Sequence, residues 1–145
     1  MKYLFTYIIL LILASPSHAA HQRSYGDISG VVYIDNYDGD TITFNIPGVH
    51  PLIGDKITVR VYGIDTPEIK GKCEKEKRLA REAKEVIKNL LSHSNNIVLK
   101  DVRRDKYFRI LATVVVDDHN IADVLFSKNL TISYFGDTKS KNWCE

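Results

Sequence analysis

The fold is decided by residues 57–92, which read ITVRVYGIDTPEIKGKCEKEKRLAREAKEVIKNLLS. Apolar and polar residues alternate from Ile57 to Gly63, and this alternation predicts a strand. From Cys73 to Ser92 apolar residues recur at helical spacing, which predicts a long helix with one apolar face. We interpret the charged residues on its other faces as a solvated surface. The segment therefore joins a strand to the longest helix of the chain.

Strand-like segments lie on both sides of this segment. Two precede it, at 27–36 and 41–46, joined by the turn dipeptide Asp38-Gly39. Two follow it, at 97–103 and 108–116, before a short helix at about 121–128. Five strands with the main helix between the third and fourth follow the order of an OB-fold. We therefore predict an α+β fold, a five-stranded OB-fold β-barrel with a long helix between strands 3 and 4 and a short C-terminal helix.

Three details complete this expectation. Prolines and glycines between residues 47 and 56 predict a long loop. Asn129 is suited to end the short helix in a left-handed conformation. The tail from Leu130 to Glu145 is expected to be irregular.

The N-terminus has the pattern of a secretory signal. Its one charge, at Lys2, precedes an apolar run and a small-residue tail. This predicts a signal peptide over residues 1–20, cleaved after Ala19 or Ala20, and a single mature domain over residues 21–145. An uncleaved anchor is the alternative, although the proline and small residues favour cleavage. We expect an exported protein, periplasmic or extracellular, without membrane attachment after cleavage.

The net charge limits how the protein can bind a polyanion. The formal charge is +2, and removing the signal with Lys2 leaves 2 − 1 = +1. A protein that binds nucleic acid by bulk charge is far more basic. Any polyanion site must therefore be local, and the best basic segment is Lys100 to Arg109. A solvated strand edge is the alternative for that segment.

The chain has two cysteines, Cys73 and Cys144, whose spacing does not fit a CxxC motif. In an exported protein an even count predicts a disulfide. The alternative is a pair of free thiols in a cytosolic protein, which the signal sequence argues against.

Three short motifs combine carboxylates with arginines. They are Asp38-Gly-Asp-Thr41, Arg60 with Asp65-Thr-Pro-Glu68, and Asp105-Lys-Tyr-Phe-Arg109. Each alone is more typical of a turn or a strand end. In combination their carboxylates suit calcium, which prefers oxygen ligands, and their arginines suit a phosphodiester. The motifs together indicate cleavage of nucleic acid.

In this order and on these strands, the three motifs resemble the staphylococcal nuclease (thermonuclease) family. The resemblance runs from about Gly30 to Tyr134, nearly all of the mature chain. It implies an OB-fold barrel and calcium-dependent, sugar-non-specific endonuclease activity that hydrolyses DNA and RNA to 3′-phosphorylated products.

The resemblance also implies roles for the matching residues. Glu68 matches the acid that activates or positions the attacking water, and Arg60 and Arg109 match the two phosphate-binding arginines. The calcium ligands implied are the carboxylates of Asp40 and Asp65 and the carbonyl of Thr66.

Further matches concern the substrate. Lys106 and Tyr107 match residues near the terminal phosphate of a bound nucleotide. Tyr134 matches an aromatic nucleotide contact, or Phe135 does if the register shifts by one residue. Exposed aromatic rings stack on bases without regard to sequence, so we expect DNA and RNA substrates, preferably single-stranded, bound by a monomer.

The chain departs from the family pattern at two places. Phe108 stands where the best-known member has a glycine. The long C-terminal helix of that member is absent, and a Cys73–Cys144 disulfide is expected to anchor the tail instead. A non-catalytic OB-fold that binds single-stranded nucleic acid or a protein is the alternative function. The presence of all the acids and both arginines favours the enzyme.

Overall fold

Residues 23–105, 107–136, 138 and 141–145 are described by the computed structural model of the chain. The predicted signal peptide and Lys106 lie outside this part of the chain. None of the helices in the described ranges has the length and apolar character needed to cross a membrane.

The main sheet follows from the alternating segments of the sequence. Its strands are β1 (Ile28–Ser29), β2 (Val32–Asn36), β3 (Thr41–Asn45), β4 (Ile57–Val61), β6 (Ile97–Arg104), β7 (Ile110–Val116) and β8 (His119–Asn120). They are hydrogen-bonded in the order β1-β6-β7-β4-β3-β2, and β8 pairs with the C-terminal end of β7 at Val115 and Val116. The pair β4–β7 is parallel and the other pairs are antiparallel. In this register Arg60 on β4 lies opposite both Thr41 and Leu111.

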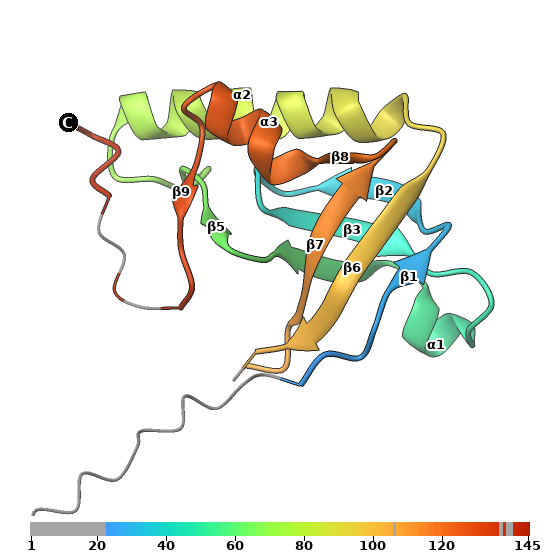
Figure 1. The fold of residues 1–145 in the computed structure, drawn as a ribbon. Coiled ribbons are helices and arrows are strands. Elements are labelled where there is room, and N and C mark those ends of the chain that lie inside the picture. Colours follow the sequence, from blue (N-terminus) through green and yellow to red (C-terminus); the bar gives the residue numbers. More distant parts are fainter. Residues whose placement is uncertain (1–22, 106, 137, 139–140) are drawn as a thin grey trace, which may run out of the picture.

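The sheet curls back on itself because consecutive segments occupy its two ends. Only Gly30 and Val31 separate β1 from β2, yet β1 pairs with β6 and β2 pairs with β3. Gly30 has a φ of 68°, a left-handed conformation that glycine adopts without a steric penalty. The five expected strands correspond to β1 with β2, then β3, β4, β6 and β7. The predicted α+β OB-fold is confirmed (Figure 1).

Two helices cover one side of the curled sheet (Figure 1). The long helix α2 (Glu74–Ser92) lies between the third and fourth strands in the sequence, as expected, and α3 (Ile121–Ser127) follows β8. Helix α2 presents its apolar face to the core, which continues into the sheet and α3. Its buried apolar members are Ala80, Ala83, Ile87 and Leu91. Asn129 has a φ of 58°, so the expected left-handed cap after α3 is confirmed.

Three local expectations were wrong. The segment 47–56 contains a short helix, α1 (Pro51–Gly54), because the ring nitrogen of His50 accepts a hydrogen bond from the Leu52 amide. The tail contains β9 (Ile132–Ser133), which pairs with β5 (Ile64–Asp65). The strand expected over 27–36 is interrupted at Gly30. Such short pairs depend on tertiary neighbours that a local pattern does not reveal.

The C-terminal residues return to the start of α2 (Figure 1). Cys144 is joined to Cys73, the N-cap of α2, by a disulfide with a Cα–Cα distance of 6.0 Å. Trp143 is buried beside it. The tail is thereby fixed next to the loop between β5 and α2.

Candidate active site

The Asp38–Thr41 turn directs Asp40 into the protein. Asp38 Oδ1 accepts hydrogen bonds from the amides of Asp40 and Thr41, at 3.1 and 2.9 Å. The buried side chain of Asn36 donates to the Asp38 carbonyl at 2.8 Å and to the Lys84 carbonyl on α2 at 3.1 Å. These contacts join the turn to the helix. Asp40 is left only 1% exposed.

Gly39 brings this turn close to the segment that carries Asp65. A Cβ at this position would lie 2.8 Å from Thr66 Cγ2 and 2.9 Å from the Ala83 Cβ on α2. Both distances are shorter than a carbon–carbon contact permits. The absence of a side chain at Gly39 is therefore what allows the two acidic motifs to meet.

We expect Gly39→Ala to destabilise the fold by about 1–3 kcal/mol, the usual cost of overpacking a core. It is also expected to weaken cation binding, because the turn must move away from Thr66. Thermal unfolding and a calcium titration measure the two effects. Adding Ala83→Gly removes the clash with α2 and should restore part of the lost stability, whereas the clash with Thr66 remains and cation affinity should stay low. Wild-type affinity in Gly39→Ala alone would show that the close approach is unimportant.

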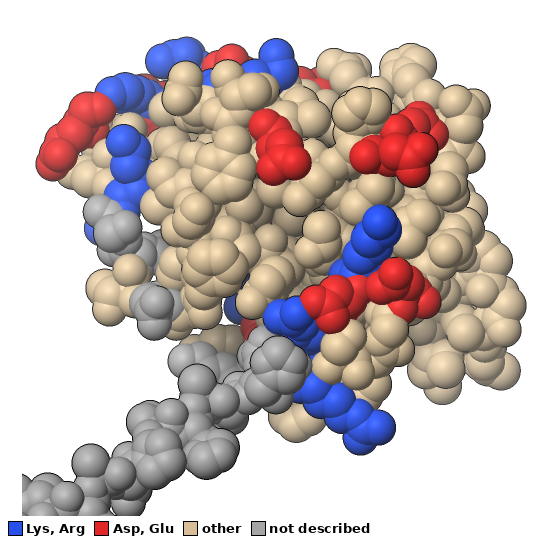
Figure 2. All heavy atoms as spheres, in the orientation of Figure 1, with Lys and Arg blue, Asp and Glu red and all other residues tan. Residues whose placement is uncertain are grey.

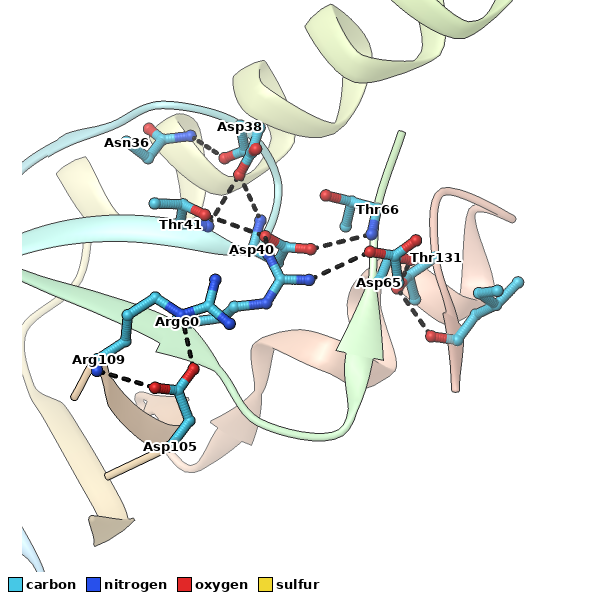
Figure 3. A network of polar contacts seen from close by, with 11 residues as sticks. Asn36, Asp38, Asp40, Thr41, Arg60, Asp65, Thr66, Asp105, Arg109 and Thr131 are labelled. Carbon is cyan, nitrogen blue, oxygen red and sulfur yellow. Dashed lines mark hydrogen bonds and ion pairs between the residues drawn. The ribbon is translucent and has the colours of Figure 1, made fainter. Parts of the chain in front are cut away.

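Arg60 joins the two buried aspartates (Figure 3). Its Nη1 lies 2.5 Å from Asp40 Oδ1, and its Nη2 lies 3.1 Å from Asp65 Oδ1. Asp65 is 2% exposed, so both carboxylates are removed from water. Two buried negative charges this close together require a positive partner. The guanidinium supplies it, because its planar fork can reach two carboxylates at once.

The carboxyl groups of Asp38 and Asp40 in the turn have raised pKa values, because they are buried close to other carboxylates. Burial raises the pKa of Asp40, Arg60 and the Thr66 amide oppose the shift, and the charges of Asp38 and Asp65 add to it, so that the pKa comes to about 7. Burial also raises the pKa of Asp38, with a further contribution from the charge of Glu68. The site therefore has an excess of negative charge that a cation would stabilise.

The oxygen atoms around Asp40 and Asp65 fit a hard cation. The Thr66 amide donates to Asp40 Oδ2 at 3.0 Å, and Thr131 Oγ1 donates to the Asp65 carbonyl at 2.9 Å. Thr66 Oγ1 is buried and has no hydrogen-bond partner within the described residues. Carboxylate and hydroxyl oxygens are the kind of ligand that a hard cation prefers, so these residues could hold one.

Arg109 is oriented by Asp105. Its backbone amide donates to Asp105 Oδ1 at 2.9 Å, and its Nε donates to Oδ2 at 2.6 Å. Partial burial alone would raise the pKa of Asp105, but the hydrogen bonds from Arg109 and from the Tyr107 amide lower it below its ordinary value. The Arg109 side chain is 53% exposed. Its direction is thus fixed by Asp105, while its outer nitrogens face solvent.

Both arginines line one cavity of about 270 Å³. The aromatic residues Tyr107, Tyr134 and Phe135 line it as well, so both candidates for the nucleotide contact lie at its wall. Phe108, beside them, is 79% exposed and has a φ of 62°, a left-handed conformation that a bulky residue rarely adopts. A glycine at this position would adopt it without strain.

Glu68 is not among the residues that line this first cavity. Glu68 and Asp65 line a second cavity, of about 580 Å³, together with Gly71, Glu76 and residues 141–144. The Glu68 charge contributes to the raised pKa of Asp38, so the two carboxylates are close enough to interact electrostatically.

The structure brings most of the sequence-predicted site together. Arg60 contacts both Asp40 and Asp65, whereas Arg109 lines the first cavity with Arg60 and Glu68 lines the second with Asp65. Lys106 belongs to the residues that are not described. Two residues were missed in part. The motif containing Asp105 gave no sign that its carboxylate would hold Arg109. We interpreted the charges of α2 as solvated, but Glu76 is buried, and nothing in the helix pattern distinguished it from its neighbours.

Charged side chains of both signs lie on the face of the molecule shown in Figure 2. They are interspersed there, without a broad area of one sign. This agrees with the small net charge of the chain. Arg60 and Arg109 instead place positive charge at the cavity, where it could contact a phosphate.

The fold and site define an OB-fold domain with a buried acidic cluster and two arginines at one cavity. The family model described as "Staphylococcal nuclease homologue" matches residues 58–143, more than half of the 145 residues. The chain therefore belongs to the staphylococcal nuclease family. The match includes Arg60, Asp65, Glu68 and Arg109 but begins after Asp40. The search of curated proteins returned no significant match.

Proposed function

We propose that this protein is a calcium-dependent, sugar-non-specific endonuclease that hydrolyses DNA and RNA to 3′-phosphorylated products. The observation that carries the proposal is the pairing of buried Asp40 and Asp65 through Arg60, with Arg109 at the same cavity. Because the chain belongs to the staphylococcal nuclease family, nuclease activity is the function that best fits such a site. The sequence motifs support the same function.

Asp40 and Asp65, with the Thr66 carbonyl, would hold the calcium ion. When bound, calcium would neutralise the phosphate and orient the attacking water. Arg60 donates to Asp40 Oδ1 and Asp65 Oδ1, so its guanidinium would compete with a cation for these two carboxylates. Loss of part of that contact would free Arg60 donors for a phosphate in the adjoining cavity.

Arg109 and Arg60 are proposed to bind the scissile phosphate. Charge builds up on the phosphate oxygens in the transition state, and guanidinium donors already in place stabilise it without reorganisation. Asp105 keeps Arg109 in one direction, which reduces the conformational freedom lost on binding. Glu68 is proposed to accept a proton from the attacking water or to position it.

The aromatic residues are proposed to bind bases. Tyr107 and Phe135 are exposed at or beside the cavity, and their rings offer stacking surfaces. Stacking is tolerant of sequence and needs unpaired bases, so single-stranded substrates should be preferred. A monomer suffices for this arrangement, because every proposed residue belongs to one chain.

Export is part of the proposal. We propose that residues 1–20 are a signal peptide and that residues 21–145 are the mature domain, periplasmic or extracellular. The Cys73–Cys144 disulfide supports this, since such bonds persist in oxidising compartments.

Replacing Asp40 is expected to weaken calcium binding at least tenfold, because it removes a charged oxygen ligand from a buried site. Asp40→Asn preserves the size of the side chain and removes only its negative charge. A change in calcium affinity, measured by titration calorimetry, therefore reports the contribution of that charge. The matched control is Asp123→Asn on the exposed side of α3, which should bind like the wild type. An unchanged calcium titration in Asp40→Asn would remove Asp40 from the metal site.

The alternative, a non-catalytic nucleic-acid binding module, is favoured by one feature. Phe108, which precedes Arg109 in the chain, exposes its ring to solvent, where it offers a further surface for stacking on bases. End-group analysis of RNA and denatured DNA after incubation separates the two functions. New 3′-phosphate ends support the nuclease, whereas retained binding without new ends supports the module.

A further inference from the structure

Glu76 is a buried carboxylate outside the proposed catalytic set. It lies in the first turn of α2 and is 8% exposed, whereas Glu74 and Lys75 beside it are exposed. A carboxylate is rarely buried unless hydrogen bonds satisfy it. Its hydrogen-bond partners therefore indicate what it does.

Both carboxylate oxygens of Glu76 hold the loop that carries Glu68. Oε2 accepts a hydrogen bond from the Lys72 amide at 2.8 Å, and Oε1 accepts a longer one from the Glu68 amide at 3.4 Å. The loop closes on itself, because the Gly71 amide donates to the Glu68 carbonyl at 2.9 Å. Residues 68–72 thus wrap around one carboxylate.

Gly71 allows the loop to wrap this closely. A Cβ there would lie 2.4 Å from Glu76 Cδ and 2.5 Å from Oε2. No side chain fits between the loop and the carboxylate. The loop conformation and the position of Glu76 are therefore coupled.

A helix cap is the simplest alternative role for Glu76. Cys73 is the N-cap of α2, and its Sγ accepts a hydrogen bond from the Glu76 amide at 3.4 Å. In a capping box the third helical residue reaches back to the N-cap amide. The Glu76 carboxylate reaches further, to the amides of Lys72 and Glu68, so it contacts the residue that the proposed mechanism uses.

We propose that Glu76 is the positioning residue for Glu68, holding its backbone so that its carboxylate stays close to the acidic cluster. This inference rests on the proposed function, because it gives Glu68 a role in the reaction. A displacement of about 1 Å in a catalytic group lowers rates by about 10²-fold. The disulfide encloses the same site, with Cys144 Sγ 4.0 Å from Glu76 Oε2.

A double-mutant cycle tests the proposal. Glu76→Gln keeps the shape but replaces one of the two acceptor oxygens with an NH2 group, which cannot accept a hydrogen bond from a backbone amide. We therefore expect kcat for single-stranded DNA to fall at least tenfold with KM nearly unchanged. In a Glu68→Ala background the same change should lower kcat less than twofold further, since Glu76 acts through Glu68. Equal losses in both backgrounds would overturn the proposal and leave Glu76 a helix cap.

Matched variants separate this role from general damage. Glu74→Gln, in the same helical turn but exposed, should retain wild-type kcat. Gly71→Ala should lower kcat as Glu76→Gln does, because its Cβ displaces the carboxylate without removing a charge. Wild-type kcat in Gly71→Ala would contradict the proposed coupling.

Amide hydrogen exchange gives a readout that does not depend on activity. The Lys72 amide should exchange at least tenfold faster in Glu76→Gln than in wild type and should be unaffected in Glu74→Gln. Unchanged exchange overturns the proposal about Glu76 whatever the activity. An inactive wild type with faster exchange in Glu76→Gln would instead refute the nuclease and support Glu76 as the residue that holds the Glu68 loop.

Discussion

Arg109→Ala is expected to lower the rate of phosphodiester hydrolysis by about 10²-fold or more, the usual effect of removing one preorganised donor from a developing oxyanion. The melting temperature should stay within about 2 °C of wild type, because the side chain is half exposed and its ion pair with Asp105 lies at the surface. A large effect on rate without an effect on stability is the signature of a residue that contacts substrate.

Initial rates on single-stranded DNA at saturating calcium, together with a thermal melt, measure both quantities. Arg81→Ala is the matched control. Arg81 is an exposed arginine of α2 and is not among the residues that line the cavity. Near-normal rates in Arg109→Ala would remove this residue from the mechanism. Equal rate losses in both variants would point to a nonspecific effect of charge.

Replacing Arg60 is a less selective test of the mechanism than replacing Arg109, although both arginines are proposed to bind the phosphate. Its guanidinium compensates the buried charges of Asp40 and Asp65. Removing one member of a buried ion pair costs about 3–5 kcal/mol. A loss of activity in Arg60→Ala would therefore combine a missing phosphate contact with a damaged site, which is why Arg109 gives the clearer answer.

Removing the disulfide is expected to have a large effect on stability. Cys73 and Cys144 are separated by 71 positions, and closing a loop of this length is worth roughly 4 kcal/mol in the chain-entropy model. For a domain of this size that corresponds to a melting temperature lower by on the order of 10 °C. Cys144→Ser is the preferred variant, because Cys73 remains in place as the N-cap of α2.

Thermal melts with and without a reducing agent test this expectation. Wild type should melt at a lower temperature when reduced, whereas Cys144→Ser should be insensitive to the reductant. The released tail should also uncover Trp143, which is buried beside the bridge, and its fluorescence should shift to longer wavelength. An intact mass with two free thiols, or a melting temperature that ignores the reductant, would contradict the assigned bridge.

The architecture could be predicted from the sequence because its signals are local and periodic. Alternation at period two marked the strands, and the apolar face of residues 73–92 marked the helix. The left-handed residue Asn129 followed from its side chain and its place after a helix. The break in the first strand depends on pairing with two different partners, β6 and β3, so no local pattern could reveal it.

The candidate site was predictable in its members but not in its geometry. The motifs identified Asp40, Asp65 and both arginines, yet they gave no indication that Arg60 would bridge the two aspartates. The role of Gly39 depends on contacts with Thr66 and Ala83, which come together only in the folded chain. Glu76 was hidden among the charges of α2, because its burial is imposed by a loop and a disulfide outside the helix.

The most direct test of the central claim is hydrolysis of heat-denatured DNA by the purified protein, measured with saturating calcium and with a chelator. Wild type should cleave with calcium and leave 3′-phosphate ends, and chelation should abolish the reaction reversibly. Arg109→Ala, assayed at the same calcium and protein concentrations, should be at least about 10²-fold slower. A folded, calcium-saturated wild type that binds the DNA without cleaving it would contradict the nuclease assignment.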